Sequence, residues 1–214
     1  MADTKDSALP AATSVAAADQ LYLVQSGVSK SVTASVLRAS AIGEGLSNAS
    51  VVGTSAAYAV DTYLAGSAIT TTAGAWQVGT ICKWQFDMVK TGAGTATPIL
   101  IVRMGTLGTT GDAAIATLTW AVGTGVVDTA RFDITVNFRT VGSGTSAVIN
   151  ANGSITHHLA ATGMTTTGAS GIGIINAVSS GFNSTTQTII GLSFNGGASF
   201  SGTNNYVFAD ADKL

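Results

Sequence analysis

The stretch ARFDITVNFR, residues 130–139, decides the fold class of this chain. Apolar Ala, Phe, Ile, Val and Phe alternate in it with Arg, Asp, Thr, Asn and Arg. Successive side chains of a β-strand point to opposite faces of the sheet, so this alternation predicts a strand with one buried and one solvated face.

Similar patterns recur on both sides of this stretch. Residues 82–88 (CKWQFDM) and 116–122 (ATLTWAV) alternate in the same way, whereas residues 99–102 (ILIV) are continuously apolar and predict a strand covered on both faces. Shorter candidate strands are residues 58–64, 172–175, 188–194 and 206–208.

Turn residues separate these strands. Asn152-Gly153 lies between two apolar segments, residues 147–149 and 155–159, and predicts a hairpin. The short spacing of the strands, without helical periodicity after residue 50, indicates an all-β fold. We expect an antiparallel β-sandwich and favour a jelly roll among the sandwich topologies.

The N-terminal part has a different composition. Residues 1–19 are small and polar and predict an extended arm, with a plain disordered tail as the alternative. Residues 20–33 (QLYLVQSGVSKSVT) predict a hairpin that turns at residues 25–27, and residues 34–38 a short helix. A Gly- and Ser-containing linker follows, so we expect an anchoring segment over residues 1–50 and a sandwich body over residues 51–214.

Charged residues are scarce in this chain. They make up 9% of its 214 residues, against about 25% in an average soluble domain, and the net charge is −2. Because no run of Lys or Arg occurs, we expect no nucleic-acid binding. No apolar run reaches about 18 residues, so we expect no membrane span. The N-terminus lacks the layout of a signal peptide, which favours synthesis in a cytoplasm.

Residues suited to catalysis or metal binding are few and scattered. Cys82 is the single cysteine, which excludes an intrachain disulfide and a thiolate-rich zinc site. His157 and His158 are adjacent, so on a strand one would face the core or a neighbour and the other solvent. Aspartates such as Asp112 and Asp128 are interpreted as turn residues. We therefore expect no enzyme activity, no metal site and no cofactor.

Two aromatic residues are candidate ligand contacts. Trp76 follows a small polar segment and is expected to be exposed in a loop, where it could stack on a sugar; Tyr63 is the second candidate. Trp84 and Trp120 fall on the apolar faces of predicted strands, where core packing is the better interpretation.

Residues 9–14 (LPAATS) and 18–33 (ADQLYLVQSGVSKSVT) resemble a segment found at the start of tailed-bacteriophage fibres and other virion proteins. Residues 84–91 (WQFDMVKT) and 102–112 (VRMGTLGTTGD) are similar to small phage structural proteins. The resemblance implies a homotrimer with an N-terminal anchoring part and a distal β domain, and it implies no catalytic residues. On the hairpin, the residues that would anchor the chain are Leu21, Tyr22, Leu23, Val24, Val28 and Val32.

The sequence thus leads to one preferred function and one alternative. The preferred function is a virion structural protein made in the host cytoplasm, a short fibre or head decoration that binds other virion proteins and contacts a host glycan or protein. The alternative is a carbohydrate-binding β-sandwich module with no catalytic activity.

Overall fold

The computed structural model describes residues 20–25, 28–33, 46–50, 54–56, 58–167 and 172–212. Every regular element in these ranges is a β-strand, which confirms the all-β prediction. The chain divides into two compact units, residues 1–43 and residues 44–214, each described by itself below.

The N-terminal unit contains an antiparallel hairpin. Strand β1 (Gln20–Gln25) pairs with β2 (Val28–Thr33), with Leu21 opposite Val32 and Gln25 opposite Val28. The predicted hairpin strands are confirmed. The predicted arm over residues 1–19 and the predicted helix over residues 34–38 lie outside the described residues.

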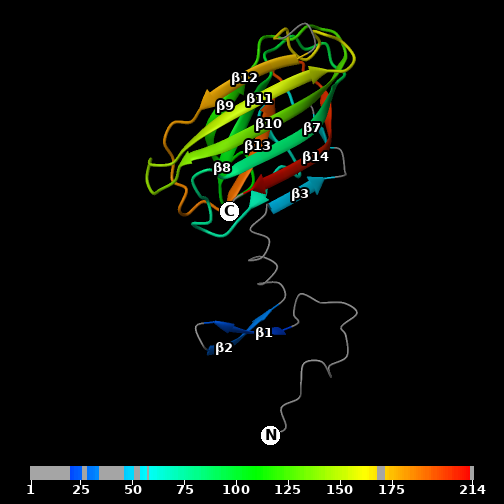
Figure 1. The fold of residues 1–214 in the computed structure, drawn as a ribbon. Helices are drawn as coiled ribbons and strands as arrows, with labels where there is room; N and C mark the ends of the chain where they lie inside the picture. The colour runs from blue at the N-terminus through cyan, green and yellow to red at the C-terminus, as the bar shows by residue number, and fades with distance from the viewer. Residues whose placement is uncertain are drawn as a thin grey trace, which may run out of the picture. The chain divides into compact units, whose positions relative to one another are not determined.

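The larger sheet of the second unit has seven antiparallel strands. Their order is β12-β11-β10-β7-β14, and both β3 and β4 pair with the free edge of β14 (Figure 1). The strands are β3 (Leu46–Ser50), β4 (Thr54–Ala56), β7 (Ile81–Lys90), β10 (Asp128–Thr140), β11 (Val148–His157), β12 (Ile172–Val178) and β14 (Gly202–Asp212).

The smaller sheet has five strands, also antiparallel. Its order is β13-β8-β9, and β5 and β6 pair with the other edge of β13. The strands are β5 (Thr62–Tyr63), β6 (Ile69–Thr70), β8 (Ile99–Gly105), β9 (Ala113–Thr119) and β13 (Ile189–Asn195).

The two sheets pack face to face, which confirms the predicted sandwich. Phe132 of β10 stacks on Phe86 of β7, with ring centroids 4.9 Å apart, and meets Phe194 of the opposite sheet edge to face at 5.7 Å. These rings and the inward residues of both sheets form a continuous apolar core. The alternation predicted for β7 and β10 is confirmed, because the residues Cys82, Trp84, Phe86, Met88, Ala130, Phe132, Ile134, Val136 and Phe138 are all buried.

The strand pairs are nested along the chain. The outermost pair joins β3 and β4 to β14, the next joins β5 and β6 to β13, then β7 pairs with β10, and β8 pairs with β9 innermost. Successive pairs belong alternately to the larger and the smaller sheet. The β11–β12 hairpin extends the larger sheet beyond β10.

The predicted Asn152-Gly153 hairpin is wrong. Strand β11 runs without a break through both residues, and Gly153 lies opposite Ile134 of β10. Gly153 faces the core, where a Cβ atom would lie 2.9–3.0 Å from side-chain atoms of Leu118, Trp120 and Ile134. Glycine is therefore required here by close packing of the sheets, as it sometimes is within strands, and not by a turn.

Three other expectations need correction. The division between the units falls after Gly43, because residues 46–50, expected near the linker, form β3 and pair with β14. The apolar run of β8 is not fully covered on both faces, since Ile99 and Ile101 are only half-buried. The predicted strand over residues 58–64 shrinks to the two residues of β5.

We predict that Gly153→Val destabilises the protein, because an isopropyl group must enter a space already filled by Leu118, Trp120 and Ile134. Overpacking of this kind costs about 1–3 kcal/mol. Asn152→Val on the adjacent exposed position is the control, with a change of no more than about 0.5 kcal/mol. Urea unfolding measures both, and equal midpoints for the two variants would contradict the packing account.

Candidate functional site

Trp76, a predicted ligand contact, is not exposed. Its side chain is buried, its ring stacks on Phe138 at 5.1 Å, and its Nε1 donates a hydrogen bond of 2.8 Å to the carbonyl oxygen of Gln187. A ring held in this way presents no face on which a sugar could stack. The expectation of a loop-exposed tryptophan is therefore corrected.

Tyr63, the second predicted contact, also has an inward hydroxyl. A Cβ atom on Gly191 of β13 would lie 1.9 Å from the Tyr63 Oη, so this oxygen packs against the backbone of the neighbouring strand. Burial raises the pKa of the Tyr63 hydroxyl.

The predicted anchoring residues lie on the β1–β2 hairpin, within the first compact unit. Their role as an anchor stays a prediction.

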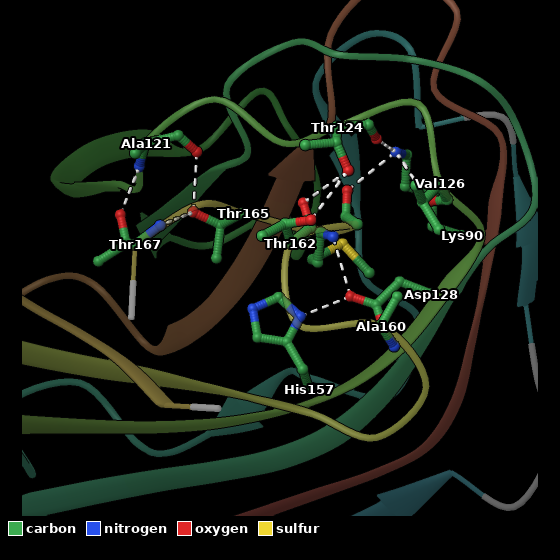
Figure 2. Close-up of polar contacts among 12 residues, drawn as sticks. Lys90, Ala121, Thr124, Val126, Asp128, His157, Ala160, Thr162, Thr165 and Thr167 are labelled. Carbon is green, nitrogen blue, oxygen red and sulfur yellow. Dashed lines mark hydrogen bonds and ion pairs between the residues drawn. The ribbon is translucent and has the colours of Figure 1, made fainter. Parts of the chain in front are cut away.

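The adjacent histidines separate as expected. The His157 side chain is 2% exposed, whereas His158 is exposed to solvent. His157 leads to a buried polar cluster at one end of the sandwich, formed by Lys90, Asp128 and His157 (Figure 2).

Asp128 is the acceptor at the centre of this cluster. It begins β10 and is fully buried, and its Oδ2 lies 2.5 Å from His157 Nδ1. The backbone N–H groups of Ala160 and Met164 donate to its carboxylate at 3.0 and 2.9 Å. One carboxylate thus ties β10 and β11 to the segment that follows β11.

Lys90 lies opposite Asp128 in the pairing of β7 with β10. It is 1% exposed, and its Nζ donates to the carbonyl oxygens of Thr124, Val126 and Gly163, the last at 2.9 Å. Burial lowers the pKa of the Lys90 ammonium, and the negative charge of Asp128 opposes part of this effect. Lys90 therefore joins the segment before β10 to the segment after β11.

Threonine side chains extend the same connection. Thr165 Oγ1 donates to the Ala121 carbonyl at 2.8 Å, and the Ala121 N–H donates to Thr167 Oγ1 at 2.8 Å. Thr124 donates to the Thr162 carbonyl oxygen at 3.1 Å (Figure 2). Residues 120–127 and 158–167 are thereby held together as two cross-linked loops, which we call the paired loops.

The paired loops carry apolar side chains on their outer surface. Val122, Val126 and Val127 are about half exposed, at 48%, 51% and 47%, and Leu159 is 65% exposed. The prediction that Val122 belongs to the apolar face of a strand is wrong, because β9 ends at Thr119. The cluster therefore fixes the backbone of loops that present apolar groups to solvent.

The cluster resembles a catalytic pair only in part. An aspartate that orients a histidine is the arrangement of a general base. The other ring nitrogen of His157, Nε2, is buried, and among the described residues it has no hydrogen-bond partner, so none of these places a nucleophile at it. Among the described residues, no three His, Cys, Asp or Glu side chains are grouped to hold a metal ion. The arrangement is suited to holding the paired loops.

A second buried cluster surrounds Arg103 of β8. Its guanidinium donates to Asp61, to Ser193 Oγ at 2.7 Å and to the Asp112 carbonyl oxygen at 2.7 Å. The Asp112 carboxylate in turn accepts from three backbone N–H groups at residues 106–108. Asp112 is therefore a turn residue, as predicted. Its carboxylate closes the turn formed by the preceding residues 106–111.

The sequence contains a signal that Lys90 and Asp128 are buried. The interpretation of Asp128 as a turn residue overlooked this signal. Lys90 continues the inward positions of Trp84, Phe86 and Met88, and Asp128 continues those of β10. An ionic residue in phase with a buried face predicts a buried partner, since an unpaired buried charge is costly.

Comparisons with known proteins add no identification. Neither a protein-family model nor a curated protein matches this chain. Within the described residues, no helix has the length and apolar character needed to cross a membrane.

We predict that Asp128→Asn destabilises the body by about 2–3 kcal/mol, because charge-assisted hydrogen bonds to a buried carboxylate are lost. Asp133→Asn on the same strand is the matched control. Its carboxylate is more than one-third exposed, so we expect a change of no more than about 1 kcal/mol. Urea unfolding gives the free energies, and amide exchange at Ala160 and Met164 should accelerate only in Asp128→Asn. Equal effects of the two variants would contradict a clamping role.

Proposed function

We propose that this chain is a bacteriophage virion structural protein, a homotrimeric β-sandwich appendage anchored by its N-terminal segment. It is made in the host cytoplasm, incorporated into the virion and has no catalytic activity. One observation carries the proposal: the body buries several of its few charged side chains, so that few charged groups remain on its outer surface. The buried charged residues are Lys90, Arg103, Asp112 and Asp128.

A surface of this kind favours assembly. Soluble monomers keep a charged coat, whereas the buried parts of protein interfaces are depleted in charged residues. Contacts between uncharged flanks also avoid the desolvation cost of buried ions. These considerations support association with further copies of the chain or with other proteins. The three-fold state and the virion partners come from the resemblance to phage structural proteins.

The topology supports the same class of protein. Nested strand pairs that alternate between two sheets are the arrangement expected of a jelly roll, here with the β11–β12 hairpin added. Viral capsid domains commonly use this architecture. Lectin domains also use it, but Trp76 and Tyr63, the aromatic candidates for sugar stacking, have their ring or hydroxyl packed inward. The virion function is therefore preferred over a carbohydrate-binding module.

The two-unit organisation supports a division into an anchoring segment and a sandwich body. The β1–β2 hairpin belongs to a unit separate from the sandwich, and an exposed hairpin or strand can be added to a sheet of a docking protein. At the sandwich, the paired loops are held rigid by the buried cluster and expose apolar side chains. We propose that they form the contact with a host surface glycan or protein.

Light scattering of the purified full chain at several concentrations tests the assembly. We expect a mass that is a stable multiple of three chains, because the resemblance to phage structural proteins implies a trimer and the scarcity of surface charge favours association. A monodisperse monomer at every concentration would contradict the proposal and would direct the next experiment to glycan binding by the free chain.

A further inference from the structure

Strand β12 forms an open edge of the larger sheet (Figure 1). It pairs with β11 over all seven residues, without a bulge or register shift. Within the described residues no strand pairs with its other side. Backbone N–H and C=O groups along such an edge are available to another strand.

The edge lacks the features that usually prevent association. β12 contains no charged residue and no proline, and its sequence is IGIINAV. Ile172, Ile174 and Val178 are exposed at 56%, 72% and 59% of their surface. Natural edge strands are commonly protected by lysine, proline or a bulge, and none of these occurs here. Exposed β-branched side chains on a regular edge instead favour pairing.

We propose that β12 pairs antiparallel with β12 of a second copy of this chain, across a two-fold axis at Ile175. In this register Ile172 lies opposite Val178 of the second copy, and Ile174 lies opposite Asn176. Apolar groups therefore meet on the outer face, with one uncharged amide beside each Ile174.

The inner face is self-complementary in the same register. Ile175 and Ala177 are only partly buried at the open end of the core, against which they pack. The two-fold axis places Ile175 against Ile175, which continues the apolar core across the junction. Ala177 lies opposite Gly173, whose inner side is already covered by Thr167. Burial of these apolar groups supplies a driving force for association.

A second copy fits this edge better than an unrelated strand for two reasons. The strand is nearly symmetric about Ile175 in its pattern of apolar residues, and a two-fold interface requires such self-complementarity. Every neighbouring pair in the sheet is antiparallel, so a two-fold axis continues the existing pattern across the junction. The absence of charge on β12 also removes repulsion between identical strands.

This contact is separate from the proposed trimer. Alone it gives dimers, and together with trimerisation it gives hexamers, each joined by β12 pairs. The two proposals can therefore succeed or fail independently, because one concerns multiples of three and the other multiples of two.

The test compares the solution masses of wild type, Ile174→Lys and Val60→Lys by light scattering. Ile174→Lys places like charges near each other across the axis, so we expect the wild-type mass to fall by half. Val60→Lys is the matched control: Val60 is 69% exposed but precedes β5 and lies outside the β12 edge, so we expect the wild-type mass. Val178→Lys replaces Ile174→Lys if circular dichroism shows that the latter is unfolded.

Three results would overturn the proposal. A wild-type chain that is monomeric at all concentrations would overturn the β12 pairing. A wild-type mass of three chains would overturn it as well, but would agree with the proposed trimer. An even multiple that persists in both Ile174→Lys and Val178→Lys would show that the copies associate elsewhere.

Discussion

The contact of Phe132 with both sheets is the interaction on which the body of this protein depends. Its ring stacks on Phe86 within its own sheet and meets Trp120 and Phe194 edge to face. Aromatic rings bury large areas and favour these two geometries, so a single residue on β10 sets how the two layers approach. The alternation of β7 and β10 follows from the same requirement, because every second residue must enter this interior.

The buried ions depend on that alternation. At one end of the sandwich the inward positions of β7 and β10 continue as Lys90 and Asp128, which lie opposite each other. Charges so placed persist only when hydrogen bonds replace water, and the segments before β10 and after β11 provide backbone carbonyl and N–H groups for this purpose. The order of the paired loops is thus a consequence of the core pattern.

The sequence predicted the parts of this structure that depend on local periodicity. The β7 and β10 strands and the β1–β2 hairpin follow from alternation and turn residues alone. Gly153 was misassigned because glycine after asparagine signals a turn locally, while its packing against Leu118 of β9 is a contact between different sheets. The same limit applies to Trp76, whose stacking on Phe138 depends on a distant strand.

The Lys90–Asp128–His157 cluster was missed for a related reason. Its members are distant in sequence, and the pairing register that joins them is a tertiary property. The prediction that one of the two adjacent histidines is buried and the other exposed is confirmed, but neither the buried histidine nor its partner was identified. Function is even harder to predict from local sequence patterns, because the proposed assembly rests on the scarcity of charged groups on the surface. A surface poor in charge indicates association without specifying the partner.

The most direct test of the virion assignment is quantitative mass spectrometry of purified phage particles from the host that carries this gene. We expect the full chain to be present in the particles at a fixed copy number that is a multiple of three, and a chain lacking residues 1–43 to be absent from them. Recovery of the full chain only from the particle-free fraction would contradict the assignment.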